Sequence, residues 1–226
     1  MADYLDLENW SRRELFDFFI NYDSPYFNVC VSVDVTKLLQ LTRDRAIKFS
    51  LAIHYFALRI ANENEAFRYR LKEKRIFVYD VINGGTTVLL PNESFAYAYF
   101  DYHRDFEQFV TGMEKAVEEV RTGTGPLKPT MRDDVIYHTT LPWMSFTSFM
   151  HARTKGRGDS IPRIVFGKFS DEGGRMMMPI SVEVHHALMD GLHVGRYLDS
   201  LERALANPEA FVGLSNVLIS STKSDL

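Results

Sequence analysis

Hydrophobic residues recur at helical spacing in four stretches of the chain. The predicted helices cover about residues 12–22, 45–62, 105–121 and 192–207. The second is apolar on most of its circumference, which indicates a helix buried in the interior. The first follows a capping-box pattern, in which the hydroxyl of Ser11 and the carboxylate of Glu14 each meet a free backbone N–H, and we expect that box to begin the helix.

Eight shorter stretches are predicted to be strands, at about residues 29–33, 76–79, 86–90, 95–99, 135–139, 145–150, 164–169 and 180–184. Those at 29–33, 95–99 and 180–184 place large apolar side chains at every second position, as strands do. Because helices and strands alternate irregularly, not as a strict βαβα series, the pattern favours an α/β fold with a mixed sheet covered by helices. No repeat or long linker divides the chain, so we expect one domain over residues 1–212 and a serine-rich tail over 213–226.

Composition excludes several classes of function. The net charge is −4 and no basic stripe is present, which argues against a nucleic-acid partner. No run of 18 apolar residues occurs and the first residues are acidic, so we expect neither a membrane span nor a secretory leader. Cys30 is the only cysteine, which rules out an intrachain disulfide and a cysteine-based zinc site and favours a cytoplasmic protein.

The most informative motif is His-His-Ala-Leu-Met-Asp-Gly, from His185 to Gly191, between the last strand and the last helix. Histidine is the side chain best suited to take a proton near neutral pH, and polar residues at such junctions are available to a cleft. Asp190 either orients a histidine or holds the turn in shape. A purely structural histidine is the commoner case, and a shared metal is disfavoured because His185 and His186 point to opposite faces of a strand.

The segment from His185 to Arg196 resembles the active-site signature of the trimeric chloramphenicol O-acetyltransferases. Three further segments resemble that family in the same order: Asn9–Glu14, Tyr102–Phe106 and Pro142–Phe149. The match extends over about residues 5–207. It implies a coenzyme A-dependent acyltransferase fold, acetyl-CoA as co-substrate with no metal, and a homotrimer whose active sites lie between subunits.

The resemblance also implies roles for individual residues. His186 is the general base, and Ser148 donates a hydrogen bond to the oxyanion that forms during acyl transfer. Asp190 and Arg12 form a structural ion pair that holds the active-site turn. Phe18 and Phe19 line the acceptor pocket, although their spacing alone fits core residues equally well. Lys168 lies near the coenzyme A end, where it attracts a phosphate.

Four departures from the family pattern concern the acceptor side more than the chemistry. Val165 stands where the family often has a threonine, and Glu183 replaces the usual glutamine before the histidine pair. Phe19 stands where the family has tyrosine or phenylalanine. Residues 151–163 form a polar, glycine-containing segment with Arg153, Lys155, Arg157 and Asp159, where the family is more apolar.

The sequence therefore predicts acetyl transfer from acetyl-CoA to a hydroxyl of chloramphenicol, which inactivates the antibiotic. The polar segment favours one alternative, an acetyltransferase of the same fold with another small alcohol or amine as acceptor. A second alternative is a non-catalytic binding domain, which the presence of His186, Ser148, Asp190 and Arg12 disfavours. A lipoyl-dependent acyltransferase core is disfavoured because the chain has no lipoyl domain.

Overall fold

The centre of the fold is α3 (Phe49–Glu63), the helix that the sequence predicts to be buried. Ten of its fifteen residues are buried, and all of these except His54 belong to the main hydrophobic core. The computed structural model describes residues 2–123, 132–153 and 159–213. The predicted tail over 213–226 lies, after Gly213, outside the described residues.

A mixed sheet packs on this helix, which confirms the predicted fold class. Its main strands, in spatial order, are β2 (Tyr26–Asp34), β10 (Arg175–His185), β8 (Arg163–Gly167), β7 (Val135–Leu141), β5 (Asn83–Leu89) and β6 (Phe95–Phe100). The short β9 (Ser170–Glu172) pairs with β10. β7 runs parallel to both β8 and β5, and the other neighbours are antiparallel. A separate small sheet has the order β1 (Asp3–Tyr4), β4 (Arg75–Val78), β3 (Tyr69–Lys72).

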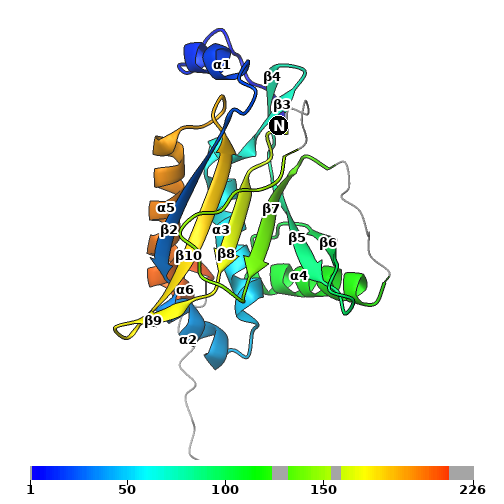
Figure 1. Cartoon of the computed structure of the whole chain (residues 1–226), viewed down its shortest axis with the longest axis vertical. Helices are drawn as coiled ribbons and strands as arrows, with labels where there is room; N and C mark the ends of the chain where they lie inside the picture. The colour runs from blue at the N-terminus through cyan, green and yellow to red at the C-terminus, as the bar shows by residue number, and fades with distance from the viewer. Residues whose placement is uncertain (1, 124–131, 154–158, 214–226) are drawn as a thin grey trace, which may run out of the picture.

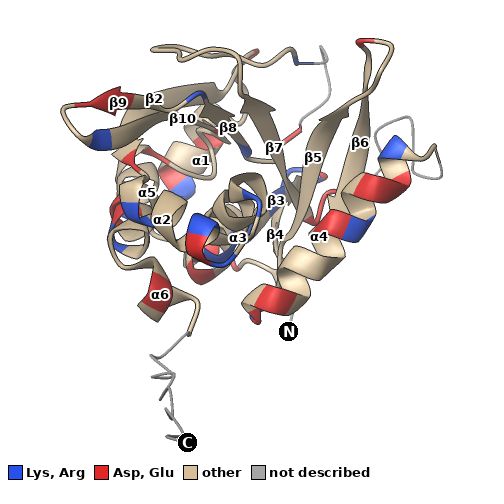
Figure 2. Cartoon of the chain, turned by 90° about the horizontal axis from the view of Figure 1, so that it is seen from below, with Lys and Arg blue, Asp and Glu red and all other residues tan. Residues whose placement is uncertain are grey.

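Most of the helices cover one face of the large sheet, as Figures 1 and 2 show. They are α2 (Thr36–Asp44), α3, the 3₁₀ helix η1 (Glu65–Arg68), α4 (Phe106–Arg121), α5 (Gly191–Ala206) and α6 (Pro208–Phe211). The short α1 (Arg13–Phe19) lies beyond one end of the sheet (Figure 1). The opposite face, which we call the front face, is crossed by the chain between β7 and β8.

This crossing chain corrects one prediction. The sequence predicts a strand over 145–150, but residues 142–150 form neither strand nor helix. β7 pairs directly with β8, so no place in the sheet remains for a strand between them. Phe146 packs instead over Gly167, where a Cβ would lie 2.8 Å from the phenylalanine ring, and this close approach requires glycine.

Other differences concern helix ends. α1 begins at Arg13 with Arg12 at its N-cap and no side-chain cap, so the predicted capping box at Ser11 is wrong. α2 was not predicted, and the long helix begins at Phe49, not near residue 45. Ala46, with φ of +53°, forms the turn that separates the two helices.

Two buried histidines face each other across the core between α3 and the sheet. His54 and His138 lie with ring centroids 5.0 Å apart, beside Phe166. The Nδ1–H of His54 donates to the carbonyl of Ser50 at 2.6 Å, which fixes its tautomer. Burial lowers the pKa of His54 to about 4 and holds that of His138 well below its usual value.

We therefore predict that acid destabilises the protein through this pair. The pKa of His54 is lower in the folded state than its ordinary value of 6.5, so the unfolded chain binds more protons and unfolding becomes easier as pH falls below 6.5. His54 alone accounts for about 2 kcal/mol of lost unfolding free energy between pH 6.5 and 5. Urea unfolding at both pH values should show a smaller loss in His54→Phe than in the wild type. Equal losses of unfolding free energy in the variant and the wild type would show that His54 does not cause the acid sensitivity.

Candidate active site

The turn between β10 and α5 presents His186 at the end of the sheet nearest α1. The strand ends at His185, whose carbonyl accepts hydrogen bonds from the backbone N–H groups of Leu188 and Met189 at 3.0 and 3.1 Å. The backbone N–H of His186 donates to the carbonyl of Pro25 at 2.7 Å, which ties the turn to the start of β2. The turn therefore has little conformational freedom, and the direction of the His186 ring is set by it.

The ring of His186 is held in one tautomer. Its Nδ1 lies 3.2 Å from the carbonyl oxygen of Met189, and because a carbonyl can only accept, Nδ1 carries the proton. In the neutral ring Nε2 is then the acceptor, and none of the described residues forms a hydrogen bond with it. A partly exposed imidazole whose Nε2 meets no protein partner is the arrangement that a general base requires.

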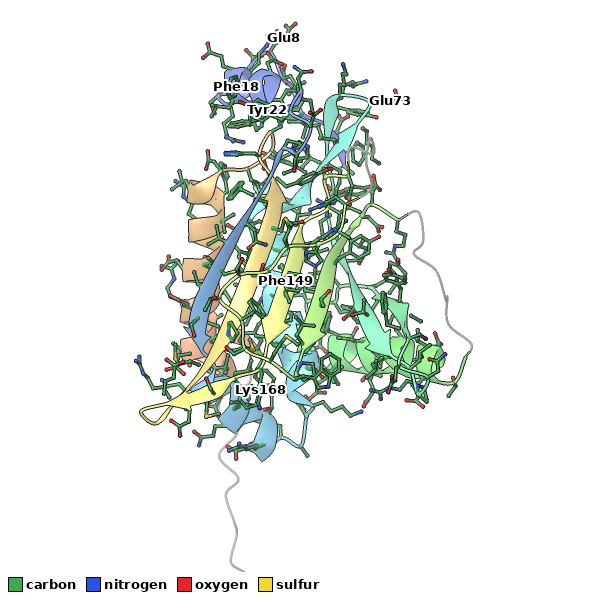
Figure 3. All side chains as sticks on the ribbon, viewed as in Figure 1. Glu8, Phe18, Tyr22, Glu73, Phe149 and Lys168 are labelled. Atoms are coloured by element: carbon green, nitrogen blue, oxygen red, sulfur yellow. The ribbon has the colours of Figure 1, made fainter. Side chains whose placement is uncertain are left out.

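Aromatic side chains surround the His186 ring. Phe19 stacks on it with centroids 3.9 Å apart and an interplanar angle of 10°, and Phe27 lies 4.7 Å away. Phe18 and Tyr22 extend this cluster outward from α1 and are 57% and 48% exposed. Figure 3 shows Phe18 and Tyr22 at the end of the molecule formed by α1. The structure thus places Phe19 against His186, and the exposure of Phe18 excludes it from the core of this chain.

Arg12 and Asp190 meet as the sequence predicts. The Nε of Arg12 lies 3.3 Å from Oδ2 of Asp190, and its Nη1 donates to the carbonyl of Leu188 at 2.6 Å. Burial opposes ionisation of Asp190, but the hydrogen bond from His193 and the charges of His193 and Arg12 lower the pKa of the carboxyl. Asp190 therefore stays ionised and, with Arg12, holds the turn from the side of α1.

Asp190 also begins the last helix. It is the N-cap of α5, where its carboxylate accepts from the backbone N–H of Leu192 at 3.0 Å, and His193 completes a capping box with it. This answers the question left open by the sequence, because Asp190 forms no hydrogen bond with His186 and acts on the turn. The capping box also explains the third histidine of the segment, His193, because its Nδ1 lies 2.8 Å from Oδ1 of Asp190.

Ser148 and Lys168 do not contact His186. Ser148 is exposed on the chain that crosses the front face, and its hydroxyl has no hydrogen-bond partner among the described residues. Figure 3 shows the adjacent Phe149 in front of the middle of the sheet and Lys168 near the end opposite α1. The backbone N–H of Lys168 donates to Met144, while its side chain is exposed. Within one chain, His186, Asp190, Arg12, Phe18 and Phe19 therefore lie together, while Ser148 and Lys168 lie apart from them.

The sequence analysis missed three members of the site. Tyr22 and Phe27 belong to the aromatic cluster around His186, and the carbonyl of Met189 fixes its tautomer. Phe27 is identifiable only through the strand register, since it pairs with Val184 beside the motif. No residue type can reveal a backbone carbonyl.

Two searches of the described residues concern other classes of site. No group of three or more histidine, cysteine, aspartate or glutamate side chains there is arranged to hold a metal ion. Within the same ranges, no helix combines the length and apolar character needed to cross a bilayer.

Two variants distinguish the role of Asp190 as the N-cap of α5 from its role as the ion-pair partner of Arg12. Asp190→Asn keeps an oxygen that caps α5 but removes the charge that faces Arg12, whereas Asp190→Ala removes both. We expect the alanine variant to be less stable than the asparagine variant by about 1 kcal/mol, the value of an N-cap. Both should be less stable than the wild type in urea unfolding, because Arg12 is left without its carboxylate. Equal stability of the two variants would show that the cap contributes nothing.

Comparisons with known proteins agree with this geometry. The family model "Chloramphenicol acetyltransferase" matches residues 2–202. Chloramphenicol acetyltransferases of Proteus mirabilis and Escherichia coli are 26% and 28% identical over 200 residues, which cover 88% of this chain and 92% and 91% of theirs.

A solved chloramphenicol acetyltransferase superposes with a TM-score of 0.80 at 28% identity, covering 91% of this chain and 100% of its own. A dihydrolipoamide acetyltransferase of Azotobacter vinelandii shares the fold, with a TM-score of 0.65 at 17% identity and coverage of 88% and 87%. The family model spans nearly all of the described chain and carries the conclusion. This chain belongs to the chloramphenicol acetyltransferase family.

Proposed function

We propose that this protein transfers the acetyl group of acetyl-CoA to a hydroxyl of chloramphenicol, with His186 as general base. The observation that carries the proposal is the fixed tautomer of His186, with Nδ1–H on the carbonyl of Met189 and Nε2 free. Family membership and the names of the relatives support the acceptor and the co-substrate.

The reaction follows from this arrangement. Nε2 of His186 takes the proton of the acceptor hydroxyl as its oxygen attacks the thioester carbonyl. The C=O π electrons move onto oxygen, and the hydroxyl of Ser148 donates a hydrogen bond to this oxyanion. When the intermediate collapses, the C–S bond breaks and the imidazolium returns the proton to the sulfur, so coenzyme A leaves as a free thiol. A positioned base contributes about 10²–10⁴ in rate.

The aromatic side chains around His186 support the choice of acceptor. Phe18, Phe19 and Tyr22 present apolar rings beside Nε2, and such rings suit the aromatic part of a small acceptor. Lys168, exposed and without an ion-pair partner among the described residues, is proposed to attract a phosphate of coenzyme A. The cytoplasmic location expected from the sequence stays a prediction.

The separation of Ser148 from His186 supports a site shared between copies. The base lies against Phe19 of α1, whereas the serine precedes Phe149, which lies in front of the middle of the sheet (Figure 3). Exposed Trp143, Met144 and Met150 lie on the same crossing chain as Ser148, and apolar side chains of this kind are typical of a subunit interface. We infer that the protein is a homotrimer in which one copy supplies His186 and its neighbour supplies Ser148.

A second acceptor class is favoured by one observation. The polar segment expected near the acceptor pocket places Arg153 and Asp159 beside Tyr26. Tyr26 begins β2 at the end of the sheet that carries the His186 turn. An acetyltransferase for another small alcohol or amine is therefore the second candidate, and the same assay with a panel of acceptors separates the two.

Free-thiol release from acetyl-CoA, with and without chloramphenicol, tests the proposal. Wild type should release thiol only in the presence of the acceptor, and His186→Ala should lose about 10²–10⁴ of the rate because the base is gone. His103→Ala, a histidine exposed on the surface, is the matched control and should keep the wild-type rate. Turnover retained in His186→Ala, with circular dichroism showing a folded protein, would remove His186 as the base. Thiol release with other acceptors alone would select the second candidate.

A further inference from the structure

A buried carboxylate lies two residues before the first histidine of the motif. Glu183 is on the front face of β10 and is only 3% exposed. An ionised carboxylate at such a position needs a counter-charge and hydrogen bonds to remain stable. Arg153 supplies both, because its Nε and Nη2 donate to Oε1 of Glu183 at 2.9 and 2.5 Å. The backbone N–H of His151 lies 3.4 Å from the other oxygen.

Arg153 also contacts the strand beside the motif. Its guanidinium lies over the ring of Tyr26, 3.9 Å from the centroid, and Tyr26 is the residue of β2 that pairs with His185. The ring of Tyr26 meets His185 edge-on, with centroids 5.1 Å apart and an interplanar angle of 80°. Asp159 connects to both Arg153 and Tyr26. Its carboxylate accepts a hydrogen bond from Nη1 of Arg153, and its backbone carbonyl accepts one from the Tyr26 hydroxyl at 2.7 Å. A continuous set of contacts thus runs from Glu183 through Arg153 and Tyr26 to His185.

His185 must be neutral for the turn to keep its shape. Its Nδ1 accepts a hydrogen bond from the backbone N–H of Ala187 at 3.2 Å, which an imidazolium cannot do. The groups that face it are Tyr26, Arg153, Asp159 and His186. Burial first and the charge of Arg153 next lower the pKa of His185 to about 4, while Asp159 acts in the opposite direction.

Glu183 and Arg153 are two of the departures from the family pattern, and in the structure they meet each other. Glu183 depends on this meeting, because its carboxylate is buried and Arg153 is the cation that pairs with it, whereas Arg153 also pairs with Asp159. The ion pair therefore accounts for both departures at once, and it fastens the start of the polar segment to the strand that ends at His185.

We propose that Arg153 is a positioning residue for acetyl transfer. Held by Glu183 and stacked on Tyr26, it keeps the Tyr26 ring against His185, so that His185 stays edge-on, the Ala187 hydrogen bond persists and His186 is presented in its reactive direction. This inference rests on the proposed role of His186 as base. It assigns Arg153 no contact with either substrate.

Two variants separate positioning from stability. Arg153→Met leaves Glu183 buried without a counter-charge, which lowers both stability and rate. Arg153→Met combined with Glu183→Gln removes the unpaired charge, so stability returns while the guanidinium over Tyr26 is still missing. Arg163→Met is the matched control, because Arg163 bonds Asp159 at 2.7 Å but makes no ring contact with Tyr26.

The readouts are kcat and KM for thiol release between pH 5.5 and 8.5, the urea midpoint, and the ring titration of His185 by NMR with ¹³C-labelled histidine. We expect Arg153→Met and the double variant to lose about ten- to a hundredfold in kcat, with KM for acetyl-CoA nearly unchanged, since misplacing a reacting group costs on this scale. The pKa of His185 should move upward in both, because the charge of Arg153 is the second cause, after burial, that lowers it. Arg153→Lys keeps the charge, so its His185 titration should be closer to that of the wild type than its kcat is. Arg163→Met should change neither the His185 titration nor kcat.

Recovery of wild-type kcat in the double variant would overturn the proposal, because a merely structural pair is repaired by removing both charges. An unchanged His185 titration in Arg153→Met would overturn it as well. The titration needs no substrate, so it tests the influence of Arg153 on His185 separately from the role of His186 as base.

Discussion

The turn between β10 and α5 is the constraint on which the rest of the site depends. It is held at its base by the bond from His186 to the carbonyl of Pro25, and at its far end by Arg12, which binds both Asp190 and the carbonyl of Leu188. Asp190 caps α5, so the helix and the turn share one anchor. With these restraints in place, the carbonyl of Met189 can fix the His186 tautomer, and a flexible loop could not.

The two faces of the sheet have different functions. One face packs apolar strand residues such as Val182 and Val184 against the helices and supplies the stability. The front face carries Ser181, Glu183 and His185, which are buried although polar, under the chain that crosses from β7 to β8. Buried polar groups need partners. Glu183 finds them on the crossing chain, while Ser181 bonds Asn28 of β2 and His185 accepts from the N–H of Ala187. The chemistry of the motif is therefore coupled to a segment far away in the sequence.

The sequence predicted the parts of this protein that rest on long periodic patterns or on a motif. The buried helix α3, the mixed sheet and the turn at His185–Gly191 are of this kind. The strand over 145–150 was wrong because β7 pairs directly with β8, and Phe146 and Phe149, three residues apart, pack as neighbours on the front face instead. The capping box was assigned to Ser11, while the structure has it at Asp190 with a histidine in the third position. Neither the Met189 carbonyl nor the meeting of Arg153 with Glu183 has a local signal, since both depend on how distant segments come together.

The central claim is that the base and the oxyanion donor come from different copies of the chain. Co-expression of His186→Ala and Ser148→Ala chains with two affinity tags, followed by isolation of the mixed oligomers, tests it most directly by thiol release. In a ring of heterologous interfaces, each mixed trimer, whichever variant is in the majority, has about one site in three that pairs an intact His186 with an intact Ser148. The account predicts that mixed oligomers recover activity far above either parent. Activity no higher than the average of the two parents would place both residues in one chain and contradict it.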